Sequence, residues 1–138
     1  MQTSFTDKQL LDKDNKSSES ILRKCVHCGM CNATCPTFCV NGEELEGPRG
    51  RIYLIKDMLE NKKPANKKVV KHIDSCLSCY SCMTTCPSGV NYMHLIDHGR
   101  NYVEETYKRP FFDRLFRNVL SFVLPRPKVF LVLAYLTK

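Results

Sequence analysis

Eight of the nine cysteines in this sequence fall into two runs with the same spacing, Cys-x-x-Cys-x-x-Cys-x-x-x-Cys-Pro. The first run consists of Cys25, Cys28, Cys31 and Cys35 before Pro36, and the second of Cys76, Cys79, Cys82 and Cys86 before Pro87. Thiolates at this spacing are typical ligands of 4Fe-4S clusters. The two runs therefore predict two such clusters.

The fourth cysteine of each run is predicted to bind the cluster of the other run. Three thiolates separated by two residues can hold three irons of one cluster, but a tight turn cannot supply the fourth ligand. The predicted ligands are Cys25, Cys28, Cys31 and Cys86 for one cluster, and Cys76, Cys79, Cys82 and Cys35 for the other. The prolines agree with this crossing, because each pushes the preceding cysteine towards an extended conformation and stops a helix there.

Zinc sites and disulfides also use paired cysteines, and they are the alternatives to iron–sulfur clusters. A tetrahedral zinc site needs separated cysteine pairs, but neither the third cysteine of a run nor the proline. A disulfide framework requires an oxidising compartment, and the sequence offers no targeting signal for one. Both considerations favour clusters over these alternatives.

The remaining candidate ligands give weaker patterns. Cys39 lies outside both runs, and we expect it to be a small buried hydrophobic residue. His27 lies inside the first run, where it can hydrogen-bond near a sulfur. The other histidines, His72, His94 and His98, form no known metal motif. We therefore predict no histidine ligand.

The formal net charge of +7 suggests a nucleic-acid partner until the clusters are counted. Each 4Fe-4S cluster with its four thiolates carries about −2, so two clusters bring the total to roughly +3. The lysines at 62–68 are typical of a solvated loop, and no aromatic residues are interleaved with them. We therefore expect no nucleic-acid binding. Residues 1–19 have no apolar core typical of a secretory signal, and together with the predicted clusters this indicates a reducing cytoplasm.

Hydrophobic residues recur at helical spacing between and after the two runs. Residues 52–59, 69–73 and 92–108 each place apolar side chains on one face of a helix. Alternation typical of strands is scarce. The sequence therefore predicts a small all-α domain in which a helix followed by a cluster turn occurs twice.

Two local signals mark the beginnings of helices. Ser17 or Ser18 is a candidate N-cap for a short helix that leads into the first run. The segment 47–50, with two glycines and a proline, indicates a turn before the helix at 52–59. Upstream, residues 1–19 are charged and polar, and we expect a flexible leader there. The predicted domain then spans residues 20–108.

Residues 109–138 form a segment of different character. Apolar residues of 111–123 fall on one side of a helix, with Arg114 and Arg117 on the other, as in an amphipathic basic helix. Packing against protein, a membrane surface and a partner groove all suit such a helix. The following apolar run at 129–136 is too short to span a bilayer. We expect residues 109–138 to be an amphipathic tail, the start of a cysteine-rich domain that this chain does not contain.

The sequence resembles the N-terminal part of the iron–sulfur subunits of glycolate oxidases (glycolate dehydrogenases). More distantly, it resembles the related subunits of lactate-utilisation, anaerobic glycerol-3-phosphate dehydrogenase and heterodisulfide reductase systems. The matching segments are SILRKCVHCGMCNATCP at 20–36, GPRGRIYLIK at 47–56, CLSCYSCMTTCPSGV at 76–90 and PRPKVF at 125–130. Of these, the segment at 47–56 points most narrowly to this family.

The resemblance implies an α-helical ferredoxin fold and an electron-transfer role beside flavin-binding subunits that oxidise a 2-hydroxy acid. Electrons would leave the flavin, cross two 4Fe-4S clusters and reach a downstream acceptor, at a membrane surface or linked to quinone. The location implied is cytoplasmic, peripheral at the inner membrane. Arg49 and Arg51 belong to the matching segment, and our hypothesis is that they offset cluster charge or dock the partner; ordinary surface or helix-start arginines are the alternative.

We predict no catalytic residue in this chain. Neither a dinucleotide-binding nor a phosphate-binding glycine motif is present, so the chain alone is not expected to turn over a hydroxy acid. A freestanding soluble ferredoxin and a zinc-stabilised binding module are the competing interpretations. The choice among glycolate, lactate and glycerol-3-phosphate rests on the resemblance only.

Overall fold

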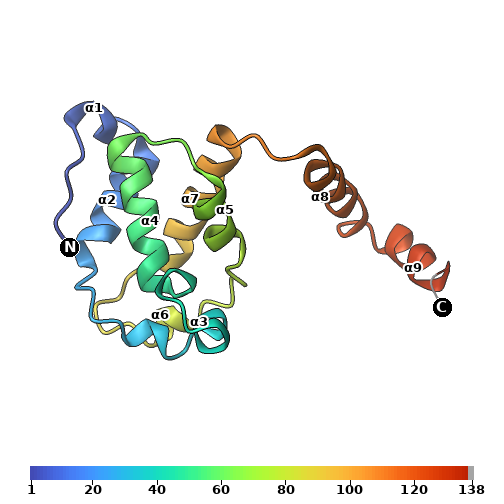
Figure 1. The fold of residues 1–138 in the computed structure, drawn as a ribbon, viewed down its shortest axis with the longest axis horizontal. Coiled ribbons are helices and arrows are strands. Elements are labelled where there is room, and N and C mark those ends of the chain that lie inside the picture. The colour runs from blue at the N-terminus through green and yellow to red at the C-terminus, as the bar shows by residue number, and fades with distance from the viewer. Residues whose placement is uncertain (137–138) are drawn as a thin grey trace. The chain divides into compact units, whose positions relative to one another are not determined.

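The computed structural model describes residues 1–136 and divides the chain into two compact units, Met1–Tyr107 and a second that begins at Lys108 (Figure 1). The described residues form helices and no strand, so the predicted all-α fold is confirmed. The α-helices of the first unit are α1 (Asp7–Leu10), α2 (Lys13–Lys24), α3 (Pro36–Asn41), α4 (Pro48–Asn61), α5 (Lys67–Asp74), α6 (Ser81–Thr84) and α7 (Tyr92–Thr106). Two short 3-10 helices, η1 (Met30–Asn32) and η2 (Glu44–Glu46), flank α3.

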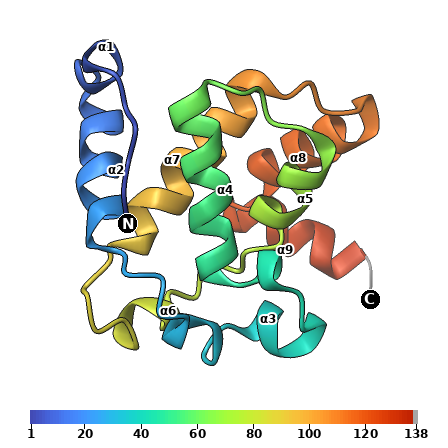
Figure 2. The same cartoon turned by 60° about the vertical axis from the view of Figure 1, so that its left-hand side comes forward.

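The core of the first unit lies between α2, α4, α5 and α7, which surround it in both views (Figure 1 and Figure 2). Fully buried aliphatic side chains come from each of these helices: Leu22, Ile55, Ile73, Leu95 and Ile96. The helices expected at 52–59, 69–73 and 92–108 are present as α4, α5 and α7. Together they hold the cluster turns at one end of the unit (Figure 1).

A glycine allows α4 and α7 to approach closely. A Cβ added to Gly99 on α7 would lie 2.8 Å from Cγ1 of Ile55 on α4. Gly50 has a similar role at the start of α4, where an added Cβ would lie 2.2 Å from the carbonyl oxygen of Glu44. That contact brings η2 directly against α4. The 47–50 segment is not the turn that we expected, because α4 already begins at Pro48, whose missing N–H costs nothing at a first helical position.

Residues 1–19 differ from the flexible leader that the composition suggested. They contain α1 and the first half of α2, which begins after Asp12 rather than at Ser17 or Ser18. Buried Gln9 donates from Nε2 to the carbonyl oxygen of Leu59 at 2.9 Å. Ser18 is fully buried and lies 2.7 Å from Nδ1 of His98. These polar contacts tie the segment to α4 and α7, and a composition-based argument could not detect them.

The second unit consists of α8 (Phe111–Val123) and α9 (Pro127–Leu136). The helix predicted at 111–123 is therefore present, and no residue of α8 is buried. Its apolar side chains are largely exposed, with Phe112 at 81 % and Phe116 at 63 %. None of the helices in residues 1–136 combines the length and the apolar character needed to cross a bilayer.

Candidate functional site

The two cysteine turns follow the same backbone path. In each run the residue before the second cysteine and the residue after it have left-handed conformations: His27 (φ 57°) and Gly29 (φ 81°) in the first turn, Ser78 (φ 53°) and Tyr80 (φ 57°) in the second. Left-handed backbone is costly for residues other than glycine, so three such residues at equivalent positions indicate a conformation that the turn requires. The sequence repeat is thus a structural repeat.

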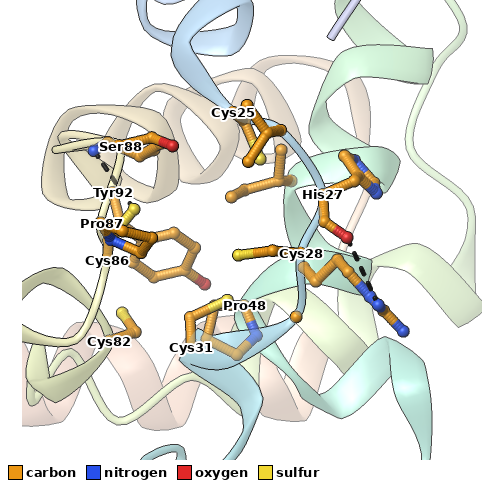
Figure 3. Close-up of a pocket in the computed structure, with 15 residues that line it drawn as sticks. Cys25, His27, Cys28, Cys31, Pro48, Cys82, Cys86, Pro87, Ser88 and Tyr92 are labelled. Atoms are coloured by element: carbon orange, nitrogen blue, oxygen red, sulfur yellow. Dashed lines mark hydrogen bonds between the residues drawn. The ribbon is translucent and has the colours of Figure 1, made fainter.

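The first turn and the end of the second run enclose a hollow that Figure 3 shows in close-up. Its cysteines are Cys25, Cys28, Cys31, Cys82 and Cys86. Their sulfur atoms point towards the middle of the hollow (Figure 3). The four predicted ligands of one cluster are therefore brought together, although Cys86 is far from the other three in sequence.

The second turn and the end of the first run enclose another hollow, which is lined by Cys35, Cys76, Cys79 and Cys82. These are the four predicted ligands of the other cluster. Pro48, Cys82 and Tyr92 line both hollows, so the two sites are direct neighbours. The extended conformation of Cys35 (φ −87°, ψ 117°), just before Pro36, directs this side chain away from its own turn.

The donor set of both hollows suits iron–sulfur clusters. The structure describes all nine cysteines and places none of them in a disulfide. Burial and the neighbouring cysteines raise the pKa of Cys31, and they raise the pKa of Cys82 to about 12. Thiols grouped in this way hold their protons until a cationic metal centre binds. Such a centre stabilises the thiolates, so this arrangement is expected at a metal site.

Hydrogen-bond donors reach several of these sulfurs. The backbone N–H of Val90 donates to Sγ of Cys86 at 3.5 Å, and the hydroxyl of Tyr92 donates to Sγ of Cys76 at 3.7 Å. Hydrogen bonds from the backbone N–H and then the hydroxyl of Ser81 lower the pKa of Cys79. Donors of this kind tune the potential of a bound cluster.

Cys39 is not the buried hydrophobic residue that we predicted. Its side chain is exposed and contacts the carbonyl oxygen of Ala33 at 3.4 Å, outside both hollows. The reason is that α3, which carries Cys39, is a single short surface helix with no buried residue. The expectation of burial was wrong for that helix.

The two arginines of the 47–56 segment have different surroundings in the structure. Arg49 is partly exposed, with 35 % of its side chain accessible, and forms a salt bridge with Glu44. It also reaches the carbonyl oxygen of His27 in the first turn at 3.5 Å, the contact drawn in Figure 3. Arg51 is 1 % exposed and cannot contact a partner subunit. Only Arg49 fits the docking half of our hypothesis.

Arg51 is the centre of a buried polar network beside the second hollow. Its guanidinium donates to the carbonyl oxygen of His72 at 2.7 Å and, at 3.0 Å each, to Glu46, Thr37 and Ser75. A fifth contact runs from Nη1 to Sγ of Cys35 at 3.8 Å. Sequence reasoning missed Glu46 and His72, because nothing in their spacing links them to each other or to a cysteine.

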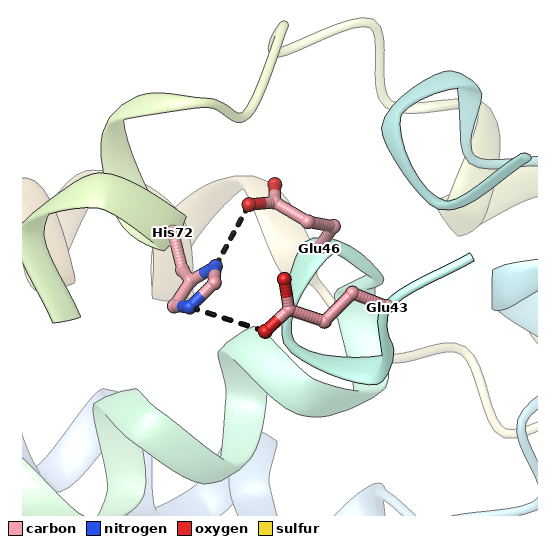
Figure 4. Close-up of side chains that lie close together, drawn as sticks. All are labelled: Glu43, Glu46 and His72. Carbon is pink, nitrogen blue, oxygen red and sulfur yellow. Dashed lines mark hydrogen bonds and ion pairs between the residues drawn. The ribbon is translucent and has the colours of Figure 1, made fainter. Parts of the chain in front are cut away.

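Glu46, His72 and exposed Glu43 lie within reach of one another, as Figure 4 shows. The Glu46 carboxylate lies 2.8 Å from Nδ1 of His72, and the Glu43 carboxylate lies 3.7 Å from Nε2. Burial would raise the pKa of Glu46, but the hydrogen bonds from Ser75 and His72 and the charge of Arg51 lower it overall. Because Arg51 already neutralises this carboxylate, the group serves as an ion-pair network rather than as a metal site.

Comparison with known proteins agrees with this geometry. Residues 21–90 match the family model described as "4Fe-4S dicluster domain". The chain is 52 % identical over 130 residues to the glycolate oxidase iron-sulfur subunit of Escherichia coli (strain K12), covering 94 % of this chain and 32 % of that protein. It is 32 % identical over 117 residues to the probable glycolate oxidase iron-sulfur subunit of Bacillus subtilis (strain 168), covering 81 % of this chain and 26 % of that protein.

A more distant relative is the mitochondrial succinate dehydrogenase iron-sulfur subunit of Candida glabrata, with 27 % identity over 84 residues, covering 56 % of this chain and 33 % of that protein. No solved structure is significantly similar to the chain. This chain spans about a third or less of the length of these relatives. The resemblance to the glycolate oxidase subunits is confirmed. Because the family model covers just over half of the sequence, this protein belongs to the 4Fe-4S dicluster domain family.

Proposed function

We propose that this chain is the two-cluster electron-transfer part of a multi-subunit 2-hydroxy-acid dehydrogenase, with glycolate as the substrate of the complex. A flavin-binding subunit delivers the electrons, and a membrane-surface or quinone-linked acceptor receives them. The observation that carries the proposal is the pair of adjacent hollows, each lined by cysteines of both runs and sharing Pro48, Cys82 and Tyr92. The similarity to the glycolate oxidase iron-sulfur subunits supports the choice of complex.

The cysteines hold the clusters in the crossed arrangement. Cys25, Cys28, Cys31 and Cys86 serve the first site, and Cys76, Cys79, Cys82 and Cys35 serve the second. A bound 4Fe-4S cluster takes up and releases one electron at a time. The protein positions the thiolates, excludes water with the apolar residues of both hollows, and donates hydrogen bonds to the sulfurs.

Exposed residues in the turns supply contact surfaces for partners. The second cysteine of each run, Cys28 and Cys79, is exposed, so each site has a short route to the protein surface. Val26 and Met30 in the first turn and Leu77 in the second are exposed apolar side chains beside these cysteines. A flavin subunit docks at one turn and the acceptor at the other, and no residue of this chain takes part in the oxidation of the hydroxy acid.

The second unit is the membrane-directed part in this proposal. Residues 108–138 contain seven basic residues and one acidic residue, a net charge of +6, whereas residues 1–107 carry +1 before the clusters are counted. The exposed apolar side chains of α8 accompany this charge. Such a basic amphipathic helix suits a cytoplasmic protein that lies peripherally at an anionic inner membrane.

The test begins with the holoprotein. After anaerobic reconstitution we expect about eight irons and eight acid-labile sulfides per chain, and EPR spectra of two magnetically coupled clusters after reduction. Coexpression with candidate flavin subunits should then give a complex in which added glycolate reduces the clusters. Zinc in place of iron would overturn the cluster function. Reduction by lactate or glycerol-3-phosphate, without any response to glycolate, would reassign the complex.

A freestanding ferredoxin predicts a different result in the same experiment. It would load both clusters but show no affinity for a flavin subunit. The exposed apolar helix α8 disfavours it, because a diffusing carrier gains nothing from such a surface.

A further inference from the structure

A fully buried cation, Arg51, lies beside the second cluster site. Arg51 has a side-chain exposure of 1 %, and it contacts Sγ of Cys35, which belongs to the second hollow. Thr37 lies against both groups: its hydroxyl is 3.2 Å from the same sulfur, accepts from the guanidinium at 3.0 Å, and donates to the carbonyl oxygen of Glu46 at 2.7 Å. A fixed positive charge therefore adjoins the thiolate that crosses from the first run.

Positive groups that the structure describes near the first site contact oxygen atoms, and the N-terminal ammonium of Met1 donates to the carbonyl oxygen of Cys25. A neutral backbone amide, that of Val90, donates to Sγ of Cys86 there. The nearby arginine, Arg49, points to the carbonyl oxygen of His27 and to the partly exposed carboxylate of Glu44. Water and dissolved ions screen such an exposed pair, whereas they screen a buried one far less.

Glu46 holds Arg51 in position and offsets part of its charge. The carboxylate accepts from Nη2 of Arg51 at 3.0 Å and from His72 and Ser75, and its side chain is 3 % exposed. The sulfur of Cys35 faces the other terminal nitrogen, Nη1. The ion pair is thus arranged with a positive group towards the sulfur.

A cation or a hydrogen-bond donor at a thiolate favours the reduced, more negative form of the cluster. We propose that Arg51 is a positioning residue that makes the second site, with ligands Cys76, Cys79, Cys82 and Cys35, the one of higher reduction potential. The electron then resides preferentially at the second site, which assigns the first site to the donor side and the second to the acceptor side. This inference rests on the proposed two-cluster function.

The experiment is a potentiometric titration of the reconstituted full chain, followed by EPR. Cys35→Ser and Cys86→Ser each mark the titration step that belongs to one site, because an oxygen ligand changes the potential of the cluster that it binds. Arg51→Gln and Glu46→Gln are then compared with Arg49→Gln, which removes the same charge from the same segment at a partly exposed position.

The two network variants are expected to shift the second-site step in opposite directions. Arg51→Gln should disfavour reduction of the second cluster at least tenfold, which means a reduction potential about 59 mV lower for a one-electron couple. Glu46→Gln should raise the reduction potential of the second cluster, because the arginine then faces the sulfur without its counter-charge. Arg49→Gln should leave this step in place. A merely structural network predicts shifts of the same sign, or none, and either result would overturn the proposal.

Iron and sulfide contents separate this inference from the function on which it rests. Fewer than about eight irons in the unaltered chain would reject the two-cluster function itself. If Arg51→Gln alone fails to retain its clusters, the sign of the shift in Glu46→Gln decides. If Arg51→Gln, Arg51→Lys and Glu46→Gln all lose the second cluster, Arg51 has a structural role and the proposal is rejected.

Discussion

The two cysteine turns of this protein share a backbone and differ in their surroundings. Both use left-handed residues at the same two positions of the run. At the first turn, the contact of Arg49 with the carbonyl oxygen of His27 is long and partly exposed. At the second turn, Arg100 donates two short hydrogen bonds of 2.7 Å each, to the carbonyl oxygen of Cys76 and to the hydroxyl of Ser78. Cysteine spacing therefore sets which group is bound, and the flanking helices set how tightly and in what field it is held.

The largest effect is expected from removing one of the two cysteines that cross between the runs, Cys35 or Cys86. Cys35→Ala should remove the cluster of the second turn, and Cys86→Ala the cluster of the first, each leaving about four irons per chain. Cys39→Ala is the matched control, because this exposed thiol lies outside both hollows and its loss should leave about eight. Iron and sulfide analysis with EPR checks this. An intact second cluster in Cys35→Ala would reject the crossed ligands.

Removing the clamp of the second turn should have the next largest effect. Arg100→Met loses hydrogen bonds to the carbonyl oxygen of Cys76 and to the hydroxyl of Ser78, a cost of about 2 kcal/mol. Arg49→Met should cost less than about 1 kcal/mol, as for an exposed ion pair. The rate of cluster loss to a chelator measures the difference. Equal rates in the two variants would show that the turns are held alike.

A smaller effect is expected from the glycine of the first turn. Gly29→Ala places a Cβ at φ +81°, and 2.7 Å from Nη1 of Arg49, so it should lower the free energy of unfolding by about 1 kcal/mol. Gly42→Ala has a comparable φ of +66° with open space around it, and it controls for the backbone strain. Thermal unfolding of the two variant holoproteins checks the prediction. The prediction fails if Gly29→Ala is more stable than Gly42→Ala.

The smallest effect concerns the tyrosine that both hollows share. Tyr92→Phe removes the hydroxyl that donates to Cys76, while the ring keeps its buried position. The second-site potential should fall, but by less than in Arg51→Gln, because a neutral donor is lost rather than a charged one. Redox titration measures both variants. A larger fall in Tyr92→Phe would assign the asymmetry to the tyrosine.

Sequence patterns predicted the local features of the molecule and missed its long-range polar contacts. Helices α4, α5, α7 and α8 followed from hydrophobic periodicity, because each buries or presents one apolar face. The spacing of the cysteines also led us to expect that cysteines of both runs meet, as they do in each hollow. The network of Arg51, Glu46 and His72 could not be predicted, since a buried ion pair requires partners from separate elements and leaves no periodic trace. The same holds for Gln9 and Ser18, whose partners lie on α4 and α7.

The interleaving of the runs has a consequence for how this molecule fails. Each hollow takes cysteines from both halves of the sequence, so a cluster in either hollow acts as a cross-link that closes a long loop of chain. Loss of the cluster at one site opens that loop. It also loosens the surroundings of the other site, because Cys82 lines both hollows. Loss of the two clusters should therefore be cooperative, and a chain with one damaged site should lose its remaining cluster faster than an intact chain loses its first.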